Sequence, residues 1–172
     1  MRPAPTWPEL GTSPIVDVHL IYDRRVVPYE VFAGVGTPVQ FVFDRTSTAG
    51  LDTGQCLAVS LSAADRWLGA PPDELLTMVE GELTRLFPAV AQARRVDGIV
   101  TRERAATFRG RPGTRALRPA TRATPPGVYL AGAWTDTGWP ATMEGAVRSG
   151  VAAARAAVDD HAGARLRQDV AA

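Results

Sequence analysis

The sequence predicts an α+β fold, because short runs of alternating apolar residues precede two stretches with helical periodicity. The strand-like runs begin at residue 14, and the first helical stretch lies between Pro71 and Pro88. A glycine-ended apolar run then leads into the second helical stretch. We therefore expect four regions: an irregular arm (1–13), a β-rich lobe (14–125), a strand–loop–helix unit (126–160) and a flexible tail (161–172).

The composition is that of a globular protein able to bury a sizeable core. The chain has 172 residues, of which 45% are hydrophobic and 22% charged. Its 19 basic and 18 acidic residues leave a net charge of +1, so we expect no nucleic-acid partner. The single cysteine, Cys56, excludes an intramolecular disulfide and a cysteine-built zinc site, and we expect no metal. No run approaches the ~20 apolar residues of a membrane-spanning helix.

The β-rich lobe begins with a strand whose two faces differ. Residues 14–22 alternate between a fully apolar face and a mixed face. The apolar face consists of Val16, Val18, Leu20 and Tyr22, and the mixed face consists of Ile15, Asp17, His19 and Ile21. Two short apolar runs, 39–43 and 56–62, follow after linkers rich in glycine and proline. This punctuation predicts a β-meander. A further strand is expected over 96–108.

The first helix is predicted from its proline start, its acidic first turn and its apolar spacing. Pro71 and Pro72 precede Asp73 and Glu74, which favour the positive end of a helix dipole. Apolar residues then recur at helical spacing until Pro88, and they are Leu75, Leu76, Val79, Leu83 and Leu86. Gly81 inside this run costs about 1 kcal/mol relative to alanine, so packing must hold the helix.

The C-terminal unit predicts a buried strand over 127–132 and a helix over 140–158. The helix has a stripe of the kind that is usually buried, formed by Met143, Ala146, Val147, Gly150, Val151, Ala154 and Val158. A second face has no large side chain, and its members are Gly145, Ser149, Ala152, Ala153 and Ala156. Such a face lets another backbone or a flat ligand approach closely. The first turn offers N–H donors to an electron-rich oxygen.

Residues 129–150 read YLAGAWTDTGWPATMEGAVRSG. This string resembles the C-terminal flavin motif of the FAD-dependent amine oxidase and phytoene desaturase superfamily. Within it, the closest resemblance is to squalene-associated FAD-dependent desaturases, the hydroxysqualene dehydroxylases. The resemblance extends upstream through PVQFVFDR (38–45), AVSLSAAD (58–65) and RERAATF (102–108), and it covers most of residues 14–158.

The resemblance implies that 126–160 is the C-terminal segment of a Rossmann-like FAD-binding domain. The strand would end at a glycine beside the cofactor, and the helix would point its N-terminus at the isoalloxazine ring. An N–H near Met143 would then meet the pyrimidine oxygen. The cofactor-binding residues implied are Gly132, Ala133, Ala141, Thr142, Met143, Gly145 and Ala146. No catalytic residue is assigned.

Three features depart from the family pattern. Many relatives have an acidic residue where this chain has Ala133, and amine oxidases have an aromatic residue where it has Thr142. The second difference argues against amine substrates. No Gly-x-Gly-x-x-Gly motif follows a strand, so the N-terminal half of the FAD-binding domain is missing. We therefore expect the C-terminal part of a longer flavoenzyme, present as a fragment, one product of a split gene, or a chain with a wrongly assigned start.

The function implied by the resemblance is that of an FAD-dependent oxidoreductase of isoprenoid and hopanoid biosynthesis, which converts hydroxysqualene to squalene. One alternative is another flavoprotein of the phytoene desaturase or amine oxidase type. The other is a non-catalytic remnant or interaction subunit. The expected partners are an apolar isoprenoid substrate and a separate N-terminal FAD-binding half. The expected location is the cytoplasm, with peripheral membrane association left open.

Four other features carry weaker signals for function. His19 on the mixed strand face is either a substrate-facing acid/base or an ordinary hydrogen-bonded histidine, and the second is favoured. Cys56 is expected to be a buried, inert thiol. Asp136 is either a site carboxylate or a cap of its own turn. The arginine-rich stretch 102–122 is expected to be a solvated loop, with contact to a diphosphate or to anionic lipid headgroups as the alternative.

Overall fold

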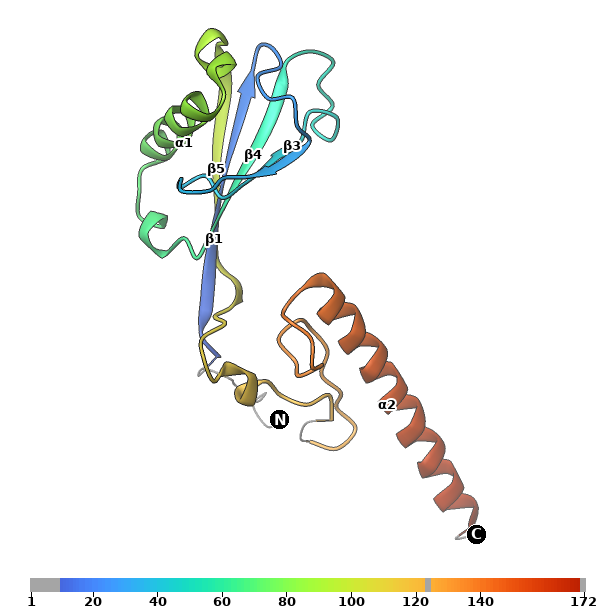
Figure 1. The fold of residues 1–172 in the computed structure, drawn as a ribbon. Helices are drawn as coiled ribbons and strands as arrows, with labels where there is room; N and C mark the ends of the chain where they lie inside the picture. Colours follow the sequence, from blue (N-terminus) through green and yellow to red (C-terminus); the bar gives the residue numbers. More distant parts are fainter. Residues whose placement is uncertain (1–9, 123–124, 171–172) are drawn as a thin grey trace. The chain divides into compact units, whose positions relative to one another are not determined.

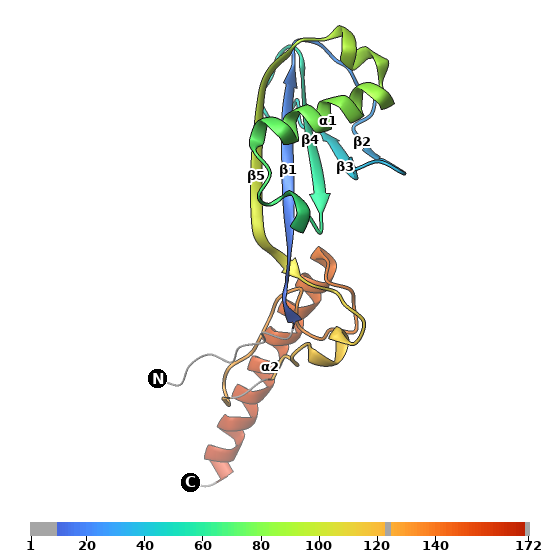
Figure 2. The same ribbon diagram turned by 90° about the vertical axis from the view of Figure 1, so that its left-hand side faces the viewer.

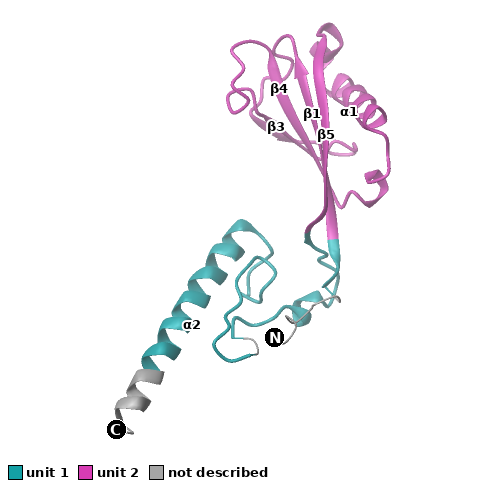
Figure 3. Cartoon of the chain, turned by 180° about the vertical axis from the view of Figure 1, so that it is seen from behind, with its two compact units in different colours: residues 1–12, 107–172 teal, residues 13–106 magenta. Residues whose placement is uncertain are grey.

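The computed structural model describes residues 10–122 and 125–170, and for 164–170 it describes the backbone alone. The chain divides into two compact units, residues 13–106 and residues 1–12 with 107–172 (Figure 3). The division falls earlier than the boundary predicted at residue 125. The reason is that residues after 107 bond within the second unit: the Arg109 amide and its Nε donate to carbonyls of residues 10–12. Residues 1–9 of the predicted arm lie outside the described residues.

The unit 13–106 is built on a five-stranded sheet with the order β2-β3-β4-β1-β5 (Figure 1). The strands are β1 (Thr12–Tyr22), β2 (Val31–Ala33), β3 (Phe41–Asp44), β4 (Gln55–Ser62) and β5 (Arg95–Phe108). The pairs β1–β4, β3–β4 and β2–β3 are antiparallel. The α+β prediction is confirmed, and all four predicted strands of this lobe form. The short β2 was not predicted.

One face of this sheet carries the core, and α1 (Pro72–Leu86) lies across it (Figure 2). The apolar face predicted for the first strand is buried, since Val16, Val18 and Leu20 are fully inaccessible to solvent. The side chains of α1 that pack against them are Leu75, Leu76, Val79 and Leu83. The alternation of β1 and the helical spacing of α1 therefore meet in a single apolar layer.

Within the unit 13–106, no helix packs against the other face of the sheet. The register places His19, Ala58 and Phe43 in one row across three strands, and Asp17, Ser60 and Phe41 in the next. At the sheet edges, Val31 and Ile99 are more than half exposed. Within this unit, the second sheet face is therefore a mixed surface of apolar and polar side chains that no helix covers.

The predicted strand at 127–132 does not form, and this prediction is wrong. The only ladder contact in this stretch of the described chain is an isolated bridge between Tyr129 and Arg122, and Val128 is 43% exposed. A strand is stable only when neighbouring strands satisfy its N–H and C=O groups, and the second unit offers none among its described residues.

The C-terminal helix, α2 (Met143–Val170), begins and ends later than predicted. It begins at Met143 because the Thr142 hydroxyl accepts a hydrogen bond from the Gly145 N–H, which makes Thr142 the N-cap. It continues beyond residue 158 because no proline follows and Asp160 accepts hydrogen bonds from Arg122 and Tyr129. Most of the predicted tail is thus helical. No helix in the described ranges combines the length and apolar character needed to span a membrane.

Of the two predicted faces of α2, only the small-residue face is covered within the described residues. The apolar stripe is exposed, with Met143 at 89%, Val147 at 63% and Val158 at 67% accessibility, whereas Ser149 and Ala156 on the small-residue face are buried. A residue pattern identifies a face that can be buried, but the neighbouring chain decides which face is covered. Here the preceding loop packs against the small residues.

Candidate functional site

The residues of the predicted flavin motif meet where the loop 132–142 joins the start of α2. Gly132 begins this loop with φ +143°, and a Cβ there would overlap the indole of Trp134, so this position requires glycine. Its N–H donates to the Ser149 Oγ at 2.7 Å, and this hydroxyl is fully buried. The hydrogen bond fixes the first residue of the loop against the second turn of α2.

The other end of the loop is held by a close backbone contact. A Cβ on Gly145 would lie 2.5 Å from the Pro140 carbonyl oxygen. The small-residue face was predicted to admit either another backbone or a flat ligand. At Gly145, the group that approaches it is the backbone of Pro140. The contact brings residues 140–142 under the first turn of the helix.

The start of α2 leaves two backbone donors available. The Gly145 N–H is used by the Thr142 hydroxyl and the Ala146 N–H by the Thr142 carbonyl. Within the described part of the chain, the N–H groups of Met143 and Glu144 have no acceptor. They lie at the positive end of the helix dipole, where they can stabilise an electron-rich oxygen.

The interior of the loop is held by Arg118, which donates to the carbonyls of four loop residues. Nη1 bonds the Trp139 oxygen at 2.7 Å, Nη2 bonds the Ala133 oxygen at 2.9 Å, and Nε bonds the Trp134 oxygen at 3.4 Å. Nη2 also bonds the Thr135 oxygen. The expectation of a solvated arginine-rich loop is wrong at this residue, and no sequence pattern marks a guanidinium that binds carbonyls of an irregular loop.

Trp139 anchors the loop to α2 through its indole ring. The Arg148 guanidinium lies 4.3 Å from the centroid of the Trp139 ring, and its Nε donates to Glu144 at 2.6 Å. A cation over an indole face is favourable, and the Glu144 carboxylate keeps that cation in place. Neither partner of Trp139 was identified from the sequence.

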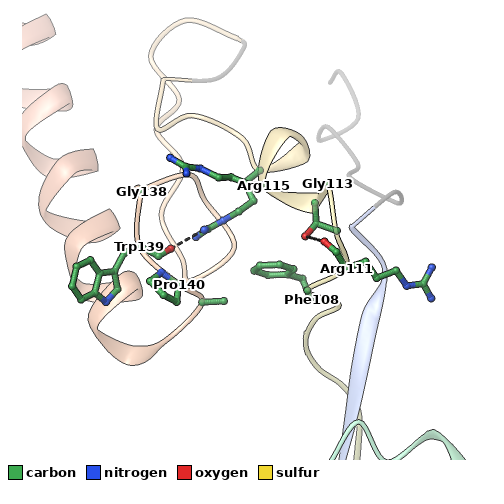
Figure 4. Close-up of a pocket in the computed structure, with 11 residues that line it drawn as sticks. Phe108, Arg111, Gly113, Arg115, Gly138, Trp139 and Pro140 are labelled. Carbon is green, nitrogen blue, oxygen red and sulfur yellow. Dashed lines mark hydrogen bonds between the residues drawn. The ribbon is translucent and has the colours of Figure 1, made fainter.

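A cavity of about 350 Å³ opens beside this loop (Figure 4). Phe108 and Pro140 face each other across it, while the Arg111 side chain points away from Trp139. Its wall also includes Gly138 and Ala141 from the motif. The cavity therefore lies next to the segment that leads into α2.

The structure brings the seven predicted cofactor residues into two neighbouring groups, Gly132 with Ala133 and residues 141–146. The available N–H groups at Met143 and Glu144 are suitable hydrogen-bond donors for a flavin ring oxygen. Gly145 and Ala146 differ, since their N–H groups are already bonded within the helix cap. Gly145 would therefore act through close packing and not as a hydrogen-bond donor.

The remaining candidates have structural partners. Cys56 is a free, buried thiol whose pKa is raised by burial, and then by the nearby Asp44 carboxylate, which agrees with an inert thiol. Asp136 accepts a hydrogen bond from the Gly138 N–H at 3.1 Å, as a carboxylate that caps its own turn does. His19 lies half-buried on the second sheet face, paired with Ala58.

Comparison with known proteins gives the same family as the motif. Residues 3–158 match the family described as flavin containing amine oxidoreductase. The chain is 44% identical over 98 residues to a hydroxysqualene dehydroxylase of Rhodopseudomonas palustris, covering 57% of this chain and 23% of that protein. It is 32% identical over 151 residues to the Sinorhizobium fredii protein of the same name, covering 85% and 33%. A 15-cis-phytoene desaturase of an Oncidium hybrid is 27% identical over 163 residues, covering 89% and 28%.

The fold also has a counterpart among solved structures. A structure described as a protoporphyrinogen oxidase from Exiguobacterium sp. 255-15 aligns with a TM-score of 0.63 at 14% identity, over 90% of this chain and 37% of that one. The chain spans about a quarter to a third of the length of the curated relatives it matches. The flavin motif on the loop and helix, together with a family match over residues 3–158, shows that this chain belongs to the flavin-containing amine oxidoreductase family.

Proposed function

We propose that this chain forms the C-terminal part of an FAD-dependent hydroxysqualene dehydroxylase. The observation that carries the proposal is the pair of available N–H groups at Met143 and Glu144, held at the start of α2 by the flavin-motif loop. The 44% identity to a relative of that name supports this substrate over other members of the family.

In this proposal the chain's residues hold one side of the flavin. The N–H groups that begin α2 bind the pyrimidine oxygen and favour the negative charge of the reduced ring. Gly132 and Ala133 bring the loop backbone close to the cofactor, and Gly145 keeps the helix start tight against Pro140. Reduced FAD, when bound, would supply the hydride that takes the place of the hydroxyl group of hydroxysqualene, and a proton from the solvent would convert the departing hydroxyl group to water.

The second sheet face supports an apolar substrate. It presents Phe41, Phe43 and Val31 beside the small Ala58. The polar side chains in the same rows are Asp17, His19 and Ser60. A polyisoprenoid binds through contact with apolar side chains and through exclusion of water from the reacting carbon. Since such a substrate resides in lipid, we also propose that the complete enzyme associates peripherally with a membrane.

A chimera tests the function. The part of the Sinorhizobium fredii protein that matches this chain is replaced by the chain itself, and the purified product is assayed anaerobically with reduced flavin and hydroxysqualene. We expect a yellow protein that forms squalene, detected by mass spectrometry, while the 172-residue chain alone purifies colourless. A folded chimera without FAD contradicts the cofactor assignment. Bound FAD with turnover of phytoene or an amine, but no squalene, contradicts the substrate assignment.

The exposed stripe of α2 supports an N-terminal FAD-binding half as the partner, either on the same polypeptide or on a separate one. Met143, Val147, Val151 and Val158 present an apolar strip that the described residues leave uncovered. The matched segment covers 23% and 33% of two relatives, which leaves a large unmatched part of each that could supply residues to cover this strip.

Val151→Asp is expected to abolish this association, because it would bury an unpaired carboxylate in an apolar interface. The measurement is co-purification of the tagged chain with the remaining part of the Sinorhizobium fredii protein, expressed separately. Ala152→Asp is the control, since it adds the same charge at an exposed position on a different face of α2. Equal recovery of the partner with both variants would show that the stripe is not the contact.

A further inference from the structure

We infer that Arg118 is the positioning residue of the flavin-binding loop: it fixes residues 133–139 so that Ala133 and the start of α2 are held in the geometry that binds the flavin. This inference rests on the proposed function and adds a residue outside the motif that the sequence identifies. Arg118 lies on the turn after the short 3-10 helix Thr114–Leu117, fourteen positions before the motif glycine, Gly132.

The contacts of Arg118 are numerous and directed at one segment. Within the described residues, all side-chain hydrogen bonds of Arg118 go to backbone carbonyls, those of Ala133, Trp134, Thr135 and Trp139. A guanidinium has five donors in one plane, which suits several carbonyls that converge on one point. A lysine ammonium has three donors and no planar fork, so it cannot reproduce this set.

The Arg118 side chain is itself held in place. It is half-buried, and its guanidinium carbon lies 5.5 Å from the centroid of the Phe108 ring. Figure 4 draws the hydrogen bond to the Trp139 carbonyl as a dashed line beside the cavity. A supported side chain loses little further freedom when it binds the loop, so its hydrogen bonds are effective in ordering the backbone.

The rest of the loop shows why this residue determines the site. The loop is tied to α2 at its ends, by Gly132 to Ser149 and by Trp139 to Arg148. Between these anchors, the carbonyls of residues 133–135 bond Arg118. Without Arg118, these carbonyls would turn toward water, and the proposed flavin contacts on both sides of the loop would lose their common support.

The test compares Arg118→Ala and Arg118→Lys with Arg115→Ala. Arg115 is the matched control, because it lies in the short helix that Arg118 follows and its side chain makes no hydrogen bond within the described residues. In the 172-residue chain, hydrogen exchange of residues 133–142 is expected to be at least about tenfold faster in both Arg118 variants. Exchange in α1 should be unchanged. Added guanidinium ion should restore slow exchange in Arg118→Ala only.

The same variants are then placed in the chimera. We expect the dissociation constant for FAD to rise at least about tenfold and the visible circular dichroism of bound flavin to change, while the Arg115 variant matches the parent. Unchanged exchange in the loop overturns the inference. Faster exchange with unchanged FAD affinity and spectrum also overturns it, since Arg118 would then order the loop without positioning the flavin. A parent chimera that folds but binds no FAD refutes the proposed function instead, and the inference falls with it.

Discussion

Replacing Gly145 with leucine is expected to separate the start of α2 from its preceding loop and to abolish FAD retention in the chimera. The reason is that a Cβ at this position would lie 2.5 Å from the Pro140 carbonyl oxygen, and a backbone atom cannot rotate away as a side chain can. The larger leucine side chain would displace residues 140–142, which carry the N-cap Thr142. The two available N–H groups would then no longer be held beside the loop.

Gly150 supplies the matched control on the same helix. A Cβ added at Gly150 meets no atom within 4 Å, so Gly150→Ala should stabilise α2 by up to about 1 kcal/mol through helix propensity. Gly145→Ala should instead destabilise the unit by about 1–3 kcal/mol, because the overlap exceeds that gain. The two alanine variants therefore differ in the sign of their effect.

Urea unfolding of the alanine variants and the FAD content of the Gly145→Leu chimera measure these effects. If both alanine variants are stabilised equally, Pro140 does not pack against Gly145. If the Gly145→Leu chimera keeps its full FAD content, the helix start does not lie beside the flavin.

Replacing Gln55 with leucine is expected to lower the free energy of unfolding of the unit 13–106 by several kcal/mol. Gln55 is 1% exposed, and its Oε1 accepts hydrogen bonds from the Val26 and Val27 N–H groups at 2.8 and 2.9 Å. Its Nε2 donates to the Val27 carbonyl at 2.8 Å and to Asp44 at 2.7 Å. Leucine would leave these groups without partners, at about 1–3 kcal/mol for each buried one. A domain with a typical stability of about 5–15 kcal/mol would then be close to unfolding.

Gln40→Leu is the control for this prediction. Gln40 also bonds backbone groups, the Ser62 N–H at 2.7 Å and the Ser62 carbonyl at 3.3 Å, but these bonds are exposed to water. Replacing Gln40 should lower the free energy of unfolding by less than about 1 kcal/mol, because water replaces the side-chain amide as hydrogen-bond partner. Equal destabilisation of the two variants in urea titrations would show that burial does not decide the effect.

The pH dependence of stability gives a second readout of Gln55. Burial raises the pKa of Asp44, but hydrogen bonds from Thr46 and Gln55 lower it more, so the folded-state pKa lies below its ordinary value of 3.8. Asp44 therefore contributes stability that is present above its unfolded-state pKa and is lost as the pH falls through the folded-state pKa. In Gln55→Leu one of these bonds is absent, so this loss of stability in acid should be smaller than in the parent.

Local residue patterns were sufficient to predict four of the strands and the helix of the unit 13–106, and also the family. The alternation of 14–22 and the apolar spacing of 75–86 each depend on one element's own geometry, and β1 and α1 form as predicted. The motif at 129–150 identified the flavin family because its residues are specific as a string, and the family match confirms it.

Tertiary contacts decided the rest, because they depend on partners that no local pattern names. The run 127–132 is apolar but lacks neighbouring strands among the described residues, so it stays irregular. The small face of α2 is buried because the loop reaches it through Pro140 and Gly132, and the apolar stripe is left exposed. Arg118 and Gln55 act through backbone groups far away in the sequence. Any arginine or glutamine can form such bonds, and only the folded chain brings the carbonyls and N–H groups within reach.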